Sequence, residues 1–164
     1  MNMENIDQYI KNGALLTEIY FDFHSLDEEK LKNLVTGFVN DVISDLLNKG
    51  YIIFGVGEIE PIEKNGEYFS TYAKLTILFK DVYKFILTVG EYNPIGIEIL
   101  KPDQINVDVG NFQECLLDLS KMIYQAKLDM MSDQARMKIK DVLKYREEKG
   151  KLIRKNVQDR NKGI

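Results

Sequence analysis

The segment YFSTYAKLTILF, residues 68–79, constrains the fold more than any other stretch of the chain. Its side chains alternate: Phe69, Ala73 and Phe79 belong to an apolar set, while Lys74 belongs to a set that is mostly polar. Successive side chains of a β-strand point to opposite faces of the sheet. The alternation therefore predicts a long strand with one face on a hydrophobic core and the other face in contact with water.

Three more runs with strand character lie in the same part of the chain, residues 51–100. They are YIIFGVGEIE at 51–60, VYKFILTV at 82–89 and IGIEIL at 95–100. Short loops join all four runs, whereas a parallel connection needs about a dozen residues of crossover. The sequence therefore predicts an antiparallel meander of four strands.

A strand followed by a helix precedes this region. The run ALLTEIYFDF at 14–23 carries β-branched and aromatic residues in partial alternation, which predicts a strand. Ser25 and Glu28 then form a capping box for a helix at 26–49, and Gly50 ends that helix. A shorter helix is expected over residues 5–12.

After the strand region, apolar residues recur every three or four positions over residues 111–130. This set is Phe112, Leu116, Leu119, Ile123, Ala126 and Met130. The spacing predicts a helix with one apolar face. We expect that face to bury itself against the hydrophobic core of the domain.

These elements predict an α+β fold in which a single antiparallel β-sheet packs against long helices. The order, β-α-β-β-β-β-α, is similar to that of the TATA-binding and helix-grip class, in which a curved sheet wraps the last long helix. A resemblance of element order implies no activity. A ferredoxin-like sandwich is the alternative, but it requires a strand after the long helix, and KLIRKNV at 151–157 is highly charged for one. We expect an α+β domain at 1–131 and a basic helical extension with a frayed tail at 132–164.

The extension carries an apolar row of its own. Continuing the first row would place Asp133, Met137 and Lys140 on the buried side, but the apolar residues lie about 100° further round the helix. They are Met131, Ala135, Ile139 and Val142. The second row therefore predicts a contact different from that of the first.

Charge is distributed unevenly along the chain. Residues 136–162 hold eleven basic and four acidic side chains, and so carry +7, whereas the whole chain carries −4. The remaining residues therefore carry −11. Such an asymmetry is typical of a segment that binds a partner.

Two interpretations of the extension follow. In the first, the protein is a non-enzymatic assembly module: Met131, Ala135, Ile139 and Val142 pack on another copy, and basic side chains lie over the acidic body of that copy. The basic set is Lys144, Arg146, Lys149, Lys151, Arg154 and Lys155. In the second, the same basic set contacts nucleic-acid phosphates without reading the base sequence. A third possibility is a ligand binder or enzyme with a pocket between the sheet and the long helix.

Residues with catalytic or metal-binding chemistry are sparse. Asp22 and His24 would project from one face of a strand, and a metal would need a third ligand. Gly55 and Gly57 lack the lysine of a phosphate loop, so we interpret them as allowing a bend or bulge. Cys115 lies on the apolar face of its helix and is expected to be buried.

The carboxylates Glu58, Glu60, Glu63 and Glu67 favour a solvated acidic hairpin, because the alternating pattern of a calcium loop is missing. We predict no catalytic residue, cofactor or metal, no membrane partner, and a cytoplasmic homo-oligomer.

Overall fold

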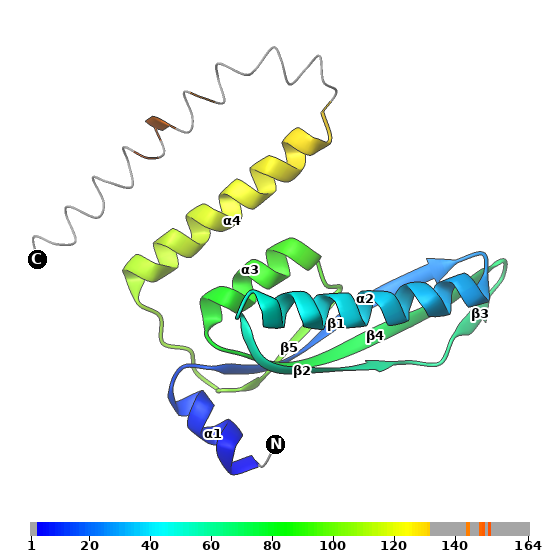
Figure 1. The fold of residues 1–164 in the computed structure, drawn as a ribbon, viewed down its shortest axis with the longest axis horizontal. Coiled ribbons are helices and arrows are strands. Elements are labelled where there is room, and N and C mark those ends of the chain that lie inside the picture. Colours follow the sequence, from blue (N-terminus) through cyan, green and yellow to red (C-terminus); the bar gives the residue numbers. More distant parts are fainter. Residues whose placement is uncertain (1–2, 132–143, 145–147, 150, 152–164) are drawn as a thin grey trace, which may run out of the picture. The chain divides into compact units, whose positions relative to one another are not determined.

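The computed structural model describes residues 3–131, 144, 148–149 and 151, which form parts of two compact units, Met1–Asp108 and Val109–Ile164. The first unit contains, in order, α1 (Met3–Lys11), β1 (Leu15–Ser25), α2 (Glu28–Asn48), β2 (Ile52–Ile59), β3 (Glu63–Asn65), β4 (Tyr68–Phe79), α3 (Val82–Tyr92) and β5 (Gly96–Lys101) (Figure 1). The second unit contains α4 (Val109–Asp129).

The strands form one antiparallel sheet in the order β2-β4-β1-β5, and β3 pairs with the start of β4. The long alternating segment is the central strand β4, and its Leu75 lies opposite Ile19 of β1. Both side chains are buried. The predicted fold class, a single antiparallel sheet packed against helices, is confirmed.

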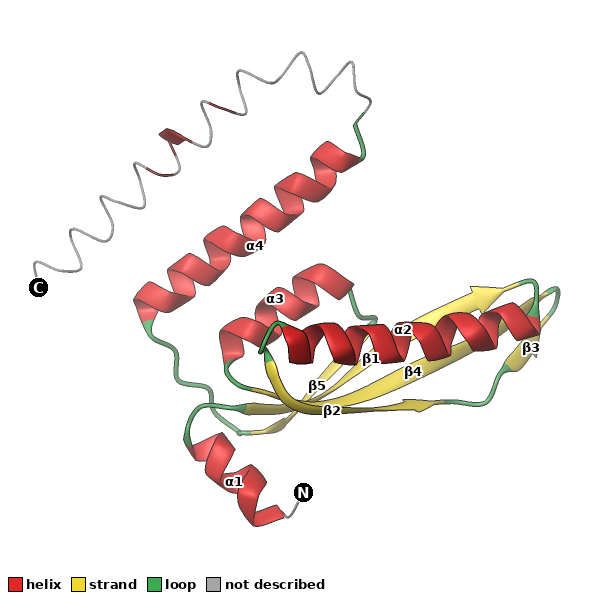
Figure 2. Cartoon of the chain, viewed as in Figure 1, coloured by secondary structure: helices red, strands yellow, loops and turns green. Residues whose placement is uncertain are grey.

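Helix α2 lies across one face of the sheet (Figure 2) and contacts β1, β2 and β4. Its buried side chains recur at intervals of three and four, which places them on one face of the helix. They are Leu31, Val35, Val39, Val42 and Leu46. The helix begins two residues later than the predicted cap: Asp27 accepts a hydrogen bond from the Lys30 backbone N–H, while Ser25 accepts one from the backbone N–H of Asp27.

The prediction of a strand at 82–89 is wrong, because these residues form most of α3. The carboxylate of Asp81 caps the helix by accepting a hydrogen bond of 2.9 Å from the Lys84 backbone N–H. At the other end, Asn93 adopts the left-handed conformation with φ 49°. The run is apolar at almost every position, so it fits a helical row as well as an alternating one, and the two caps favour the helix.

The prediction of a four-stranded meander is therefore wrong for the part that follows β4. Helix α3 carries the chain from β4 across to the far edge, where β5 pairs with β1 instead of with β4. Gly66 lies in the turn that joins β3 to β4 and adopts φ 66°.

Gly55 and Gly57 face α2 at a close approach between helix and sheet. They lie opposite Ile77 and Leu75, so they point to the core side. A Cβ atom built at Gly57 would stand 2.3 Å from Cγ1 of Val39. A register shift in β2 lies between Ile52 and Phe54, ahead of the two glycines rather than at them. The glycines therefore allow α2 to pack directly on the β2 backbone.

Candidate functional site

Among the described residues of the second unit, the apolar row on α4 is the most exposed hydrophobic feature. Leu116 and Ile123 are 45% and 49% exposed, and Met130 is 88% exposed. Phe112 and Leu119 are half-buried. The sequence predicted this helix correctly, and the packing of its apolar row on the core of the domain stays a prediction.

The row has the spacing of a coiled-coil seam. Starting from Val109, which is 67% exposed, apolar residues follow at alternating intervals of three and four through the whole helix. The complete set is Val109, Phe112, Leu116, Leu119, Ile123, Ala126 and Met130. In heptad terms Val109, Leu116, Ile123 and Met130 occupy the a positions, and the other three occupy the d positions. A seam of this kind normally packs against another helix.

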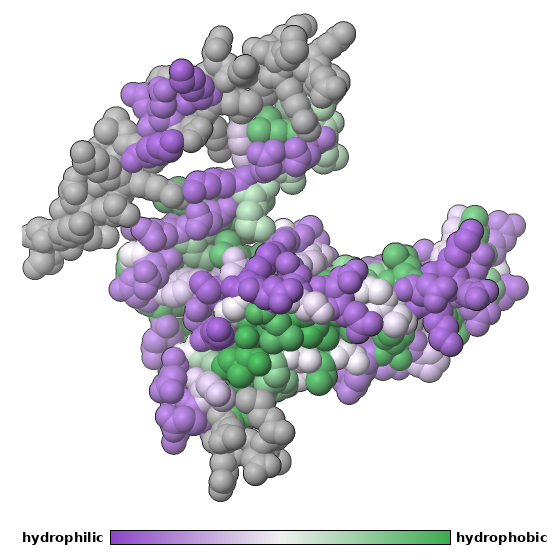
Figure 3. All heavy atoms as spheres, viewed as in Figure 1, coloured by the Kyte–Doolittle hydropathy of each residue, from purple (hydrophilic) through white to green (hydrophobic). Residues whose placement is uncertain are grey.

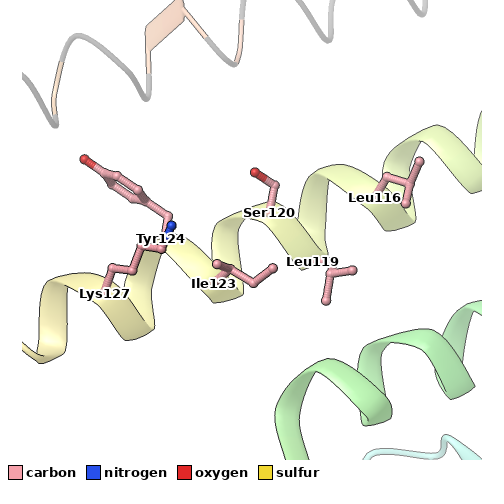
Figure 4. A pocket seen from close by; sticks show the side chains of 6 residues that line it. All are labelled: Leu116, Leu119, Ser120, Ile123, Tyr124 and Lys127. Atoms are coloured by element: carbon pink, nitrogen blue, oxygen red, sulfur yellow. The ribbon is translucent and has the colours of Figure 1, made fainter. Parts of the chain in front are cut away.

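A hollow of about 410 Å³ lies along the same row. It is lined by Leu116, Leu119, Ser120, Ile123, Tyr124 and Lys127. Figure 4 shows all six side chains projecting from α4, with those of Ser120 and Tyr124 on the opposite side of the helix from that of Leu119, which belongs to the row. Polar groups thus flank an apolar strip, as they do beside a helix-binding surface.

Few of the predicted interface residues lie within the described part of the chain. Met131 is described and is 37% exposed. Lys144, Lys149 and Lys151 are exposed and have helical backbone. Six other predicted contacts lie outside the described residues: Ala135, Ile139, Val142, Arg146, Arg154 and Lys155.

Asp22 and His24 project from one face of β1, as predicted, and they meet Ser70 of β4. The Nε2 atom of His24 lies 3.0 Å from Oδ2 of Asp22, and its Nδ1 atom lies 3.0 Å from Oγ of Ser70. These two contacts define the orientation assigned to the imidazole ring of His24. The side chains of His24 and Asp22 are 58% and 45% exposed, so water competes for the hydrogen bonds between them and Ser70. This exposed arrangement does not favour activation of Ser70 as a nucleophile.

The predicted acidic hairpin is held by a lysine on the same face of the sheet. Lys74 Nζ lies 2.7 Å from Oε2 of Glu58 and 3.6 Å from Oε1 of Glu18. The hydrogen bond that Lys74 donates to Glu58 raises the pKa of Lys74. Within the described part of the chain, no three His, Cys, Asp or Glu side chains are placed to share a metal ion.

A charged cluster that sequence reasoning missed joins the ends of α2 and α3. Lys49 Nζ lies 2.7 Å from Oδ2 of Asp45 and 2.7 Å from Oε1 of Glu91. The hydroxyl of Tyr92 donates a hydrogen bond of 2.5 Å to the same Asp45 oxygen. Only the pair Asp45 and Lys49, four residues apart on one helix, was visible in the sequence.

Ionisation is strongly perturbed within this cluster. Burial lowers the pKa of Lys49, but hydrogen bonds to Asp45 and Glu91 outweigh burial and raise it well above its usual value. Burial, followed by the hydrogen bond to Asp45, raises the pKa of Tyr92. The hydrogen bonds from Lys49 and Tyr92 lower the pKa of Asp45. These shifts keep Asp45, Lys49 and Tyr92 in their ordinary charge states at neutral pH, so the cluster is suited to holding two helices together.

Within the same described residues, no helix is both long enough and apolar enough to cross a membrane. Among families of known proteins, the model of the MJ0538 family matches residues 16–159, a range that includes parts of both compact units. Neither a curated protein nor a solved structure matches the chain.

Proposed function

The chain belongs to the MJ0538 family, and we propose that it is a non-enzymatic assembly module whose copies associate through the C-terminal helical region. The observation that carries this proposal is the exposed heptad row of α4, whose a positions Val109, Leu116, Ile123 and Met130 are all at least 45% exposed.

The pattern of the row supports a second copy of α4 as the partner. A seam at a and d buries each side chain in a hole formed by four residues of a facing helix. β-branched residues at a, such as Val109 and Ile123, together with leucine at d, as at Leu119, favour two strands over three or four. Because α4 has 21 residues, the seam extends over about 32 Å.

The magnitude of burial is sufficient for a reversible dimer. Covering the exposed parts of the four a residues in both copies would contribute roughly 7–15 kcal/mol. Immobilising two copies costs about 4–15 kcal/mol. The free energy gained by burial is therefore similar in size to the cost of association, which favours a reversible dimer. Contacts made by residues beyond α4 would then determine the affinity.

Charge supports contact between different parts of neighbouring copies. The first unit, residues 1–108, has nine basic and eighteen acidic side chains, and so carries −9. The second unit, residues 109–164, has thirteen basic and eight acidic side chains, and so carries +5. The opposite charges of the two units favour docking of one copy on another electrostatically.

We place this assembly in the cytoplasm, where the single Cys115 would remain a thiol. Nucleic-acid binding through the basic segment stays a prediction, and so does a ligand pocket between sheet and long helix. Among the described residues, those that line the hollow on α4 all belong to that helix.

Sedimentation velocity of the full chain over a range of concentrations tests the proposal. We expect a dimer or larger species that dissociates on dilution. Salt should weaken association only in part, because the apolar seam is insensitive to screening. Self-association would be refuted if the chain remained a single monomeric species at every concentration up to roughly 100 μM.

A further inference from the structure

Neither α2 nor α3 makes extensive contacts with β5. Helix α2 contacts β1, β2 and β4, and α3 contacts β4, whereas the extensive contacts of β5 are with β1. Hydrophobic side chains are accordingly visible at the surface of the sheet unit, beside the hydrophilic outer side of α2 (Figure 3).

Core-facing rows of the sheet run out to β5, and their side chains on that strand are exposed. Ile97 lies opposite Ile19, and Ile99 lies opposite Thr17. Ile19 and Thr17 are 1% and 0% exposed, yet Ile97 and Ile99 are 46% and 40% exposed. Ile95, just before the strand, is 63% exposed. One edge of the sheet therefore presents a row of three isoleucines.

The opposite edge of the sheet is built differently. Its core-facing positions on β2 include Gly55 and Gly57, which lie against Ile43 and Val39 of α2. Val56 is 53% exposed but faces the other side of the sheet, opposite Thr76. The helix thus covers the core side of β2 and leaves the core side of β5 bare.

We propose that β5 is a second self-association surface, at which β5 pairs antiparallel with β5 of another copy and extends the sheet. An exposed apolar edge strand is a ready template for strand pairing. Pro94 and Pro102 flank the strand and confine this pairing to the residues between them, because proline cannot donate to a ladder.

The side chains of β5 select one register for this pairing. Residues directly opposite each other in an antiparallel pair share a face of the sheet. A twofold axis at Glu98 would place two carboxylates opposite each other, which is destabilising. An axis at Ile99 would run into the register shift next to that residue. An axis at Ile97 places Ile97 opposite Ile97 and Ile95 opposite Ile99, and so joins six isoleucines in one row.

This surface is independent of the seam on α4. A chain with two different twofold surfaces forms tetramers or larger assemblies, whereas a chain with one such surface forms dimers. The proposal therefore goes beyond self-association through α4 and can hold or fail separately from it.

The solution mass of Ile97→Lys, compared with Val56→Lys, tests the edge. Both substitutions place a lysine on an exposed position of an edge strand, so both test the cost of charge equally. We expect Ile97→Lys to halve the mass of the assembly, and we expect Val56→Lys to leave the mass unchanged. Circular dichroism checks that both variants keep the fold. Equal masses for wild type and a folded Ile97→Lys would overturn the proposal, and would indicate that another segment covers β5.

The variant Leu116→Glu separates the two surfaces. If both proposals hold, Leu116→Glu leaves a dimer held by β5, and the double variant with Ile97→Lys is monomeric. A monomeric Leu116→Glu overturns the β5 proposal alone. A Leu116→Glu variant with wild-type mass, combined with a monomeric Ile97→Lys, supports β5 and refutes the seam.

Disulfide trapping tests the register. In a Cys115→Ser background, Ile97→Cys should form an interchain disulfide on mild oxidation, because Cα atoms of opposed residues lie about 4.5–5.5 Å apart. Val56→Cys in the same background serves as the control and should remain reduced. Equal cross-linking of the two variants would overturn the register.

Discussion

Replacing Gly57 by alanine tests the packing of α2 on the sheet. The new methyl group would lie 2.3 Å from Cγ1 of Val39, far inside van der Waals contact. Val39 is 7% exposed, and a valine in a helix has one strongly preferred rotamer. Its side chain therefore cannot relieve the clash by changing rotamer. The helix or the strand must therefore shift.

The expected loss follows from two opposing effects. Overpacking of this kind costs about 1–3 kcal/mol. The lower conformational entropy of the unfolded alanine chain returns about 0.4–1 kcal/mol. We therefore expect Gly57→Ala to lower the free energy of unfolding by about 1–2 kcal/mol. Gly55→Ala is the matched control: its Cβ would lie 3.3 Å from Cδ1 of Ile52, the end of a flexible side chain, so its effect should be small.

A double-mutant cycle assigns the loss to this one contact. Val39→Ala alone removes about two buried methylene equivalents, and should cost about 1.6 kcal/mol plus any cavity term. It also removes the atom that clashes, so the double variant Val39→Ala/Gly57→Ala should be more stable than the two single losses predict, by about 1 kcal/mol. Urea unfolding at matched protein concentration measures all four proteins. Additive losses, or a Gly57→Ala protein as stable as wild type, would contradict the packing described for α2.

Two further predictions concern the charged clusters. Tyr92→Phe removes the hydrogen bond to Asp45 and should lower the free energy of unfolding by about 1–2 kcal/mol at neutral pH. In the folded protein the pKa of Asp45 lies below its ordinary value of 3.8. The stability that Asp45 contributes is therefore present above pH 3.8 and is lost as the pH falls through the folded pKa. The difference between wild type and Tyr92→Phe should therefore narrow in urea titrations at acid pH, and a constant difference would contradict the assignment. If the basic segment binds nucleic acid, retention of the full chain on single-stranded DNA should fall steeply with salt and vanish when residues 132–164 are removed; no retention at low salt would exclude this alternative.

Segments with a single period were predicted from the sequence. The alternation of residues 68–79 and the three-and-four spacing of apolar residues in 112–130 each fit one secondary structure only, and both elements are present. Residues 82–89 fit two periods, because Phe85 and Val89 belong to an alternating set and also to a helical row. Asp81 and Asn93 were the local signals that distinguish the two, and their capping geometry explains why the helix forms.

Contacts between distant segments could not be predicted in the same way. That Asp22 and His24 share a face follows from strand geometry, but the contact with Ser70 depends on the register of β1 against β4. The same limit applies to Gly57, whose neighbour Val39 is set by the position of α2 on the sheet. Periodicity predicted the apolar row of α4, but it carries no information on what the row packs against.

Two adjacent leucines on α4 allow the most direct test of self-association through the seam. Leu116 lies in the row and Leu117 lies about 100° away from it, and they are 45% and 41% exposed. The measurement is the solution mass of Leu116→Glu beside that of Leu117→Glu, each compared with the wild-type chain of 19.0 kDa. We expect Leu116→Glu to reduce the mass of the assembly and Leu117→Glu to leave it unchanged. The same mass for both variants, whether reduced or not, would contradict association through the heptad row.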